Sequence, residues 1–159
     1  MQIFYHGTNA EWLLEISKNG LRKPCLATTP ELAACYAECA DGDGEQVVLG
    51  VALPDDADLA VDWKSMSEPV GFGGKTSKSL DDAVRELLLQ KSDVSWQETS
   101  AITGAVLSMT DVPPERLWVE SGPCGHLFGA AQKAAGLATG LPGRGATDVS
   151  RKVSRSFAG

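Results

Sequence analysis

Long apolar runs and paired cysteines are both missing from this sequence. No apolar stretch approaches the roughly 20 residues that a membrane-spanning helix needs, so we expect no contact with a membrane. The 4 cysteines form no CxxC pair, which predicts reduced thiols and no metal site. The first residues lack the basic and then apolar pattern of a secretory signal, because His6, Asn9 and Glu11 interrupt it. These absences together predict a cytoplasmic protein.

Positive charge is scarce in most of the chain. Residues 1–120 hold 9 Lys and Arg against 20 Asp and Glu, whereas residues 121–159 hold 5 against 1. A body this acidic binds nucleic-acid phosphates poorly, which favours a protein as the macromolecular partner. The basic residues at the end of the chain either meet phosphate or fold back on the acidic body.

The length and composition are those of one globular domain, and the order of the predicted elements favours the α+β class. The chain has 159 residues, of which 43% are hydrophobic and 22% charged. Residues 46–53 form a continuous β-branched run, which predicts a central strand buried on both faces. We predict about five strands and three helices over residues 1–122. Residues 123–159 read as a Gly/Ala-rich basic tail that forms a small helix over 127–137 or is partly disordered.

The second half of the chain has weaker local signals. A surface loop is predicted over residues 64–79, and a helix capped by Ser79 follows it. Residues 94–100 read as a connector. Strands are then predicted over residues 102–109 and 116–119.

The first 40 residues carry the clearest pattern. A strand over residues 2–6 is ended by Gly7-Thr8-Asn9, and a helix over residues 11–19 ends at Gly20, where a left-handed residue is needed. A short strand over residues 26–28 leads into Thr29-Pro30, which is typical of a helix start.

This order of elements resembles the NAD-dependent ADP-ribosyltransferase fold. The resemblance is closest to the branch with a His-Tyr-Glu signature, which includes diphtheria-toxin-like enzymes, poly(ADP-ribose) polymerases and RNA 2′-phosphotransferases. It covers roughly residues 3–120 and is sharpest over residues 5–37. It implies a split β-sheet core and NAD as a substrate.

The resemblance also implies roles for individual residues. His6 would hydrogen-bond a ribose hydroxyl, the backbone of Gly7 would pair with the nicotinamide carboxamide, and Tyr36 would stack on the nicotinamide ring. Thr8 would bond locally or contact ribose. Further contacts with the nicotinamide are expected from Tyr5 or Trp96.

The third signature residue is an acid that normally lies at the start of a late strand. The predicted strand over residues 102–109 begins without an acid, so Glu98 is the nearest candidate. Gln97, Glu115 and Glu120 stay open as alternatives, as does the absence of any such acid.

These expectations lead to a mono-ADP-ribosyltransferase that moves ADP-ribose from NAD to a macromolecular acceptor and releases nicotinamide. An RNA 2′-phosphotransferase is the first alternative, and it predicts a basic cleft beside His6. A non-catalytic module that binds a nucleotide or a partner is the second. The position of Glu98 separates this module from the enzyme, since only the enzyme needs its carboxylate in a cleft with His6 and Tyr36.

Overall fold

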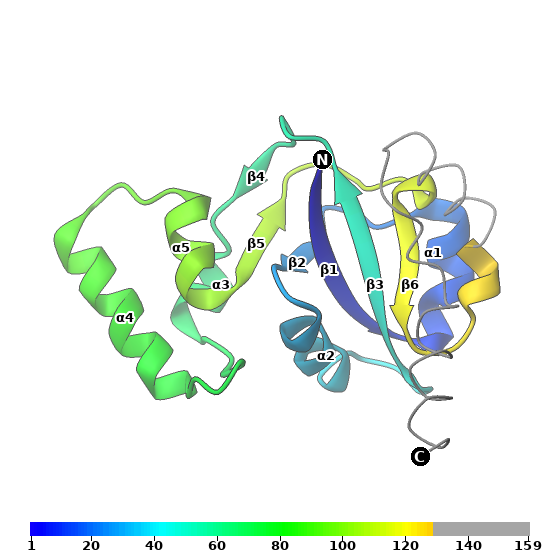
Figure 1. Cartoon of the computed structure of the whole chain (residues 1–159), viewed down its shortest axis with the longest axis horizontal. Coiled ribbons are helices and arrows are strands. Elements are labelled where there is room, and N and C mark those ends of the chain that lie inside the picture. The colour runs from blue at the N-terminus through cyan, green and yellow to red at the C-terminus, as the bar shows by residue number, and fades with distance from the viewer. Residues whose placement is uncertain (129–159) are drawn as a thin grey trace, which may run out of the picture.

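The computed structural model describes residues 1–128, which form an α+β arrangement around one antiparallel sheet (Figure 1). Within these residues the sheet has 6 strands in the order β4-β5-β2-β1-β3-β6. The strands are β1 (Gln2–Asn9), β2 (Cys25–Ala27), β3 (Gln46–Leu53), β4 (Leu59–Ala60), β5 (Ala105–Ser108) and β6 (Leu117–Ser121). The helices are α1 (Leu13–Asn19), α2 (Pro30–Glu38), α3 (Trp63–Ser67), α4 (Ser77–Gln90) and α5 (Trp96–Thr103). Short 3-10 turns are η1 (Ala10–Trp12), η2 (Pro114–Arg116) and η3 (Gly125–Phe128). The α+β class is thus confirmed, with more helices and strands than the pattern predicted.

The sheet has a weak junction in its middle. β1 pairs with β3 along its whole length, from Gln2↔Leu53 to Asn9↔Gln46. On its other edge β1 pairs with β2 only at Tyr5↔Ala27. β2 continues the sheet by pairing with β5 over its three residues. The two halves of the sheet are therefore joined in register at a single residue pair of β1.

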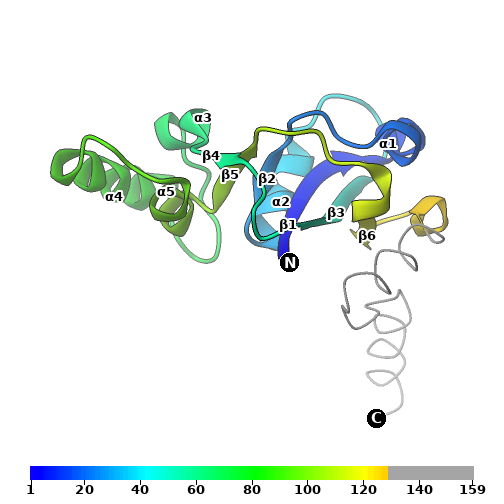
Figure 2. The same cartoon turned by 90° about the horizontal axis from the view of Figure 1, so that it is seen from above.

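Helices cover both faces of the sheet, and β3 is buried between them (Figure 2). Val47, Leu49 and Val51 belong to the main hydrophobic cluster, which includes Leu13 and Ile16 of α1. Val48 belongs to a second cluster under α2. Because successive side chains of a strand point to opposite faces, α1 and α2 lie on opposite sides of the sheet. The predicted strand over residues 46–53 and its burial on both faces are confirmed.

Several predicted local signals in the first half are also confirmed. Thr29 caps α2, since its side-chain oxygen accepts a hydrogen bond from the backbone of Leu32 at 3.3 Å. Gly20 ends α1 with a φ of 73°. The predicted strand over residues 26–28 is displaced by one residue, because β2 starts at Cys25.

The predictions for residues 64–103 need correction. The expected loop contains α3, and α4 begins earlier than predicted because Thr76, not Ser79, is its cap. The expected connector from residue 96 onward and the first residues of the expected strand over 102–109 are helical and form α5. Ser95 and Glu98 make a reciprocal capping box at the start of α5, and Gly104 ends it with a φ of 71°. The strand is confined to β5 as a result.

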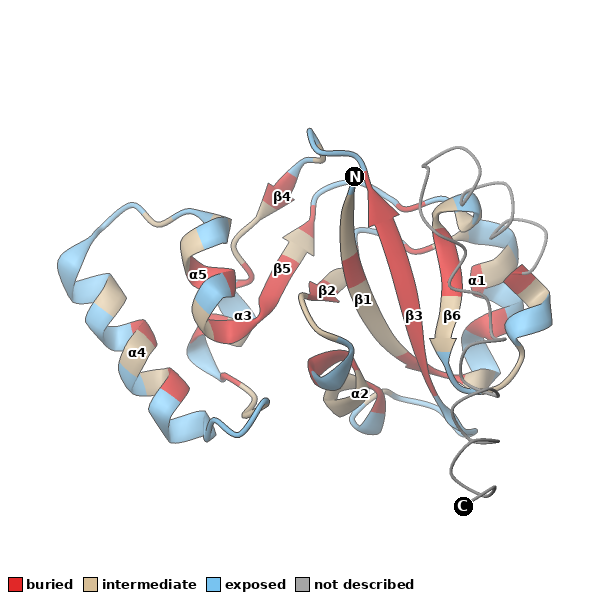
Figure 3. Cartoon of the chain, viewed as in Figure 1, coloured by how far each residue is buried: buried red, intermediate tan, exposed pale blue. Residues whose placement is uncertain are grey.

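The α4–α5 pair lies beside the sheet and leaves most of α4 exposed (Figures 1 and 3). Leu80 and Val84 are its buried residues, whereas 89% of Leu89 is exposed. α4 is the longest described helix, at 14 residues. Within residues 1–128, none of the helices combines the length and the apolarity that a bilayer crossing requires.

The core extends past residue 122, where the tail was expected to start. Phe128 in η3 is 1% exposed and belongs to the main cluster with Leu13 of α1. The other residues of the expected small helix and tail, 129–159, lie outside the described part.

Candidate functional site

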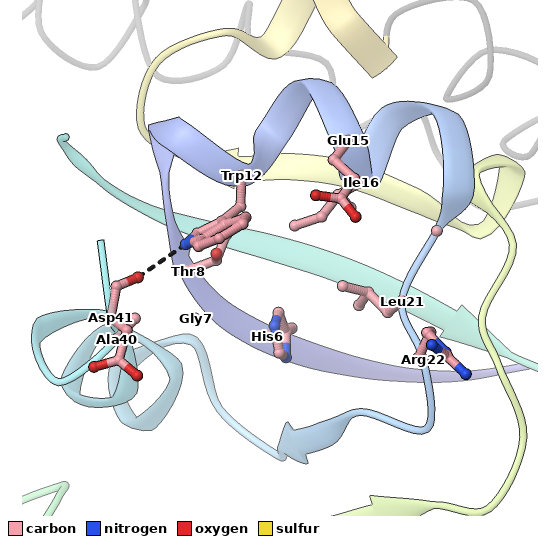
Figure 4. A pocket seen from close by; sticks show the side chains of 11 residues that line it. His6, Gly7, Thr8, Trp12, Glu15, Ile16, Leu21, Arg22, Ala40 and Asp41 are labelled. Atoms are coloured by element: carbon pink, nitrogen blue, oxygen red, sulfur yellow. Dashed lines mark hydrogen bonds between the residues drawn. The ribbon is translucent and has the colours of Figure 1, made fainter. Parts of the chain in front are cut away.

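A depression of about 480 Å³ opens between α1 and β1 (Figure 4). Its lining comes from β1, from η1 and α1, from the segment after α1 and from the segment after α2. The lining residues are His6, Gly7, Thr8, Trp12, Glu15, Ile16, Gly20, Leu21, Arg22, Ala40 and Asp41. Three of the residues expected to contact NAD, on adjacent positions of β1, therefore share one depression.

His6 is held by a hydrogen bond that reaches across the open part of the sheet junction. Its Nδ1 lies 3.0 Å from the carbonyl oxygen of Cys25. A carbonyl oxygen only accepts, so Nδ1 carries the proton and Nε2 is the acceptor of the neutral ring. Burial lowers the pKa of His6 from its ordinary value of 6.5, which favours this neutral form. Within residues 1–128, Nε2 has no hydrogen-bond partner, so it is available to a hydroxyl group in the depression.

Gly7 is required by the packing of α2 against β1. A Cβ atom built on Gly7 would lie 1.9 Å from the carbonyl oxygen of Ala33 and 2.6 Å from the backbone nitrogen of Ala37. This contact explains the glycine without any ligand. The backbone of Gly7 nevertheless lines the depression, and the β1–β2 ladder does not reach it. Thr8 is 5% exposed and also lies in the lining.

Tyr36 lies on the other face of β1, in α2. Its ring packs against the second hydrophobic cluster, as does that of Tyr5. Its hydroxyl oxygen lies 3.3 Å from Oγ of Ser65 in α3. Burial raises the pKa of Tyr36 to about 12, so the phenol is neutral at physiological pH. Tyr36 does not line the depression that contains His6.

A buried carboxylate links Tyr36 with β2, the strand in which the carbonyl oxygen of Cys25 accepts the hydrogen bond from His6. Asp62 is 8% exposed, and its Oδ2 accepts hydrogen bonds from Cys25 Sγ at 2.6 Å and from Ser65 Oγ at 3.0 Å. Its Oδ1 accepts from the backbone nitrogen of Ser65 at 3.1 Å, which caps α3. Burial, followed by the hydrogen bond to Asp62, raises the pKa of the Cys25 thiol, so this cysteine is an inert donor and not a nucleophile. We call Asp62, Cys25, Ser65 and Tyr36 the Asp62 network.

The structure does not bring Glu98 together with His6 and Tyr36. Its Oε1 accepts a hydrogen bond from Lys91 Nζ, and its Oε2 accepts from the backbone and the hydroxyl of Ser95. The Lys91 hydrogen bond is the main cause that lowers the pKa of Glu98 to about 2. Glu98 thus caps α5, and it does not line the depression.

Trp96 and the alternative acids also lie elsewhere. Trp96 packs edge-on against Phe4, with ring centroids 6.4 Å apart, and belongs to the edge of the main cluster. Glu120 accepts a hydrogen bond from Trp118 Nε1 at 2.8 Å. Neither Gln97 nor Glu115 lines the depression.

The acidic residues that line the depression with His6 are Glu15 and Asp41. Glu15 projects from α1, and Arg22 from the segment between α1 and β2 (Figure 4). Neither side chain takes part in an ion pair within residues 1–128. Sequence reasoning missed Glu15 and Asp62. The position of Glu15 on the helix after the HGT segment was a usable signal, whereas nothing local marks Asp62.

Trp12 forms one wall of the depression and is fixed in place. Its Nε1 donates a hydrogen bond to the carbonyl oxygen of Asp41 at 2.8 Å, and Asn9 Nδ2 donates to the same oxygen at 2.9 Å. The segment after α2 is thereby tied to η1 through Trp12 (Figure 4) and to the end of β1 through Asn9.

In the described part of the chain, no three His, Cys, Asp or Glu residues are grouped so that they could hold a metal ion. Comparisons with protein-family models, with curated proteins and with solved structures found no match. The assignment of a function therefore depends on the geometry of the site.

Proposed function

We propose that this chain is an NAD-dependent mono-ADP-ribosyltransferase with the split sheet of that fold, acting on a macromolecular acceptor and more readily on a protein than on a nucleic acid. The observation that carries the proposal is the position of His6 and Gly7 at the sheet junction. The β1–β2 ladder consists of Tyr5↔Ala27, so the next residues of β1 pair with β3 on one edge and lack a ladder partner on the edge toward β2. His6 presents an unpartnered acceptor there, in a depression with a cation and two carboxylates.

The reaction breaks the bond between the nicotinamide nitrogen and C1′ of the ribose. The bonding electrons leave with nicotinamide, and positive charge develops on the ribose as an oxocarbenium-like transition state. A nucleophilic atom of the acceptor then bonds to C1′ and loses its proton to a base or to water. The protein assists by fixing the ribose and by placing negative charge near the developing cation.

His6 suits the first task. In the neutral tautomer that Cys25 imposes, Nε2 accepts a hydrogen bond from a ribose hydroxyl. Arg22 supplies an unpaired positive charge in the same lining, which suits the pyrophosphate of NAD. Tyr36 offers an aromatic ring on the other face of β1, where its hydroxyl is hydrogen-bonded to Ser65.

Glu15 suits the second task better than Glu98. Its carboxylate lies in the depression with His6 and is engaged in no hydrogen bond or ion pair within residues 1–128. Both oxygens of Glu98 already accept hydrogen bonds at the start of α5. In this proposal Glu15 stabilises the developing positive charge.

The test is nicotinamide release from NAD by the purified protein and by matched variants. We expect His6→Ala and Tyr36→Ala to abolish release, and Glu15→Gln to reduce it about 100-fold, the effect typical of losing an electrostatic stabiliser. Glu98→Gln and the exposed control Glu38→Gln should release nicotinamide at the rate of the parent protein. If Glu98→Gln lost activity while Glu15→Gln kept it, the assignment of the acid would be wrong.

Binding of NAD is measured separately, because transfer requires an acceptor. NAD at millimolar concentration should raise the melting temperature of the parent protein, and His6→Ala should remove this shift. A parent protein that neither releases nicotinamide nor gains thermal stability with NAD would contradict the proposal.

One observation favours a second candidate, a module that binds NAD or another nucleotide without transferring ADP-ribose. The acid expected from the resemblance, Glu98, is occupied in the cap of α5. This module would show the NAD-dependent thermal shift, with the same dependence on His6, and no nicotinamide release with any acceptor. An RNA 2′-phosphotransferase is less well supported, because Arg22 is the only cation in a lining that also contains Glu15 and Asp41.

A further inference from the structure

We infer that Asp62 is a positioning residue that orients Tyr36 and His6 together, through hydrogen bonds that run to both of them. This inference rests on the proposed function, since it assigns Asp62 a task in the same NAD site. Asp62 itself does not line the depression.

The branch to Tyr36 has a defined direction. Ser65 Oγ donates a hydrogen bond to Asp62 Oδ2 across 3.0 Å, which uses the single hydrogen of the hydroxyl. Ser65 Oγ therefore accepts from the hydroxyl of Tyr36, at 3.3 Å. The phenol hydrogen points at Ser65, and the ring plane of Tyr36 is held from its far end.

The branch to His6 passes through a strand residue. Cys25 Sγ donates to Asp62 Oδ2 at 2.6 Å, and the carbonyl oxygen of Cys25 accepts from His6 Nδ1 at 3.0 Å. Cys25 is the first residue of β2, beyond the pair that joins β2 to β1. The Asp62 bond therefore anchors the strand end that supports the imidazole.

Capping of α3 does not by itself explain Asp62. The cap uses Oδ1, which accepts from the backbone nitrogen of Ser65. Oδ2 is turned to two side-chain donors instead, and no ion pair neutralises the carboxylate within residues 1–128. Asparagine caps a helix as well as aspartate does, but it offers a single acceptor oxygen. The second oxygen is thus the feature that a cap does not need.

This difference supplies the decisive variant. Asp62→Asn keeps the size of the side chain and its oxygen for the α3 cap, and replaces the oxygen that receives Cys25 and Ser65 with an amide donor. We expect the melting temperature to stay close to that of the parent protein, and the dissociation constant for NAD to rise about 10-fold or more. Asp56→Asn, an exposed aspartate before β4, is the matched control and should change neither quantity.

The two branches are tested separately. Ser65→Ala removes only the hydroxyl between Asp62 and Tyr36, and should weaken NAD binding about as much as Asp62→Asn does. Ser65→Thr keeps the hydroxyl and should restore binding. Cys25→Ser keeps a donor to Asp62 and should bind NAD as tightly as the parent protein does. Cys25→Ala removes this donor and should bind NAD more weakly.

A spectroscopic readout distinguishes positioning from general stability. The chain has 2 histidines, so the ¹⁵N shifts of the His6 ring can be assigned with His126 as the internal reference. Asp62→Asn should shift the His6 Nδ1 resonance away from that of the hydrogen-bonded parent and leave His126 unchanged.

The outcomes separate this inference from the proposed function. Unchanged His6 shifts in a folded Asp62→Asn protein, together with unchanged NAD affinity, would overturn the role of Asp62 while the transferase proposal stood. If the parent protein does not bind NAD, the transferase proposal fails and the inferred role in its NAD site fails with it, whatever the ¹⁵N shifts show. Should Asp62→Asn fail to fold, Ser65→Ala carries the same test, and unchanged NAD affinity in that variant would overturn the inference.

Discussion

The imidazole of His6 hydrogen-bonds to β2 where the backbone ladder between β1 and β2 has no further residue pair. Its Nδ1 lies 3.0 Å from the carbonyl oxygen of Cys25, at the point where the ladder between β1 and β2 has already ended with Tyr5↔Ala27. One ring nitrogen thus adds a second link between the two halves of the sheet beside the Tyr5↔Ala27 pair, and the other nitrogen is left for a ligand. The hydrogen bond to Cys25 and the proposed hydrogen bond to a ribose hydroxyl therefore both require the same tautomer of His6, with the proton on Nδ1.

A pH-dependent loss of stability follows from this relationship. Burial lowers the folded-state pKa of His6 below 6.5, so the unfolded chain binds its proton more tightly than the folded one. The stability contribution of His6 is therefore complete above about pH 6.5 and is lost as the pH falls toward the lowered folded-state pKa. In urea denaturation at pH 5, 6 and 7, the free energy of unfolding should fall less for His6→Gln than for the parent protein. His126→Gln is the control, and it should keep the slope of the parent.

The contact between Gly7 and α2 predicts a steric cost. A Cβ at position 7 would lie 1.9 Å from the backbone oxygen of Ala33, which no side-chain rotation can relieve. Gly7→Ala should therefore lower the free energy of unfolding by about 1–3 kcal/mol, as overpacking typically does. Gly125→Ala, whose new Cβ would meet its nearest neighbour at 4.0 Å, is the matched control. Equal stability of the two variants would contradict the packing of α2 on β1.

The capping box of α5 predicts an effect in acid. Hydrogen bonding, chiefly from Lys91, lowers the pKa of Glu98 from 4.5 to about 2. A carboxylate with a lowered folded-state pKa stabilises the protein above its unfolded pKa, and this contribution is lost as the pH falls from about 4.5 toward 2. Thermal unfolding of Glu98→Gln should therefore show a smaller drop in melting temperature across this interval than the parent protein shows. If Glu98→Gln and the parent protein lost the same number of degrees between pH 4.5 and 2, the capping box of α5 would not persist in solution.

The position of Phe128 predicts where the folded core ends. Its side chain is 1% exposed and packs in the main cluster with α1, so Phe128→Ala should cost about 3–5 kcal/mol of unfolding free energy. Leu89→Ala removes a side chain that is 89% exposed, and should change stability by less than about 0.5 kcal/mol. Chemical denaturation of both variants measures the difference. A near-neutral Phe128→Ala would return the boundary of the core to residue 122.

Local signals were sufficient where one short stretch of chain decides the conformation. The run over residues 46–53 becomes β3 with the predicted bounds, and Thr29 caps α2, because strand burial and helix capping depend on neighbouring residues. The helix α5 was predicted as a connector and a strand, although Ser95 and Glu98 have the spacing of a capping box. The apolar residues that follow this capping box favoured a strand. Because α5 is short, its packing against neighbouring elements decides where it ends.

The candidate site divides in the same way. The sequence by itself determined a first strand that starts at Gln2 and carries His6. The predicted end of this strand at His6 was wrong, because pairing with β3 continues to Asn9↔Gln46 and places Gly7 and Thr8 on the strand as well. Only the tertiary structure decided that Glu15 shares their depression and that Glu98 does not. The Asp62 network likewise joins Cys25, Tyr36, Asp62 and Ser65, whose meeting depends on how β2, α2 and α3 pack. Hydrogen bonds between residues this far apart in the chain produce no periodic pattern in the sequence. The register of the sheet and the packing of the helices therefore decide which of these residues meet, and the local sequence does not.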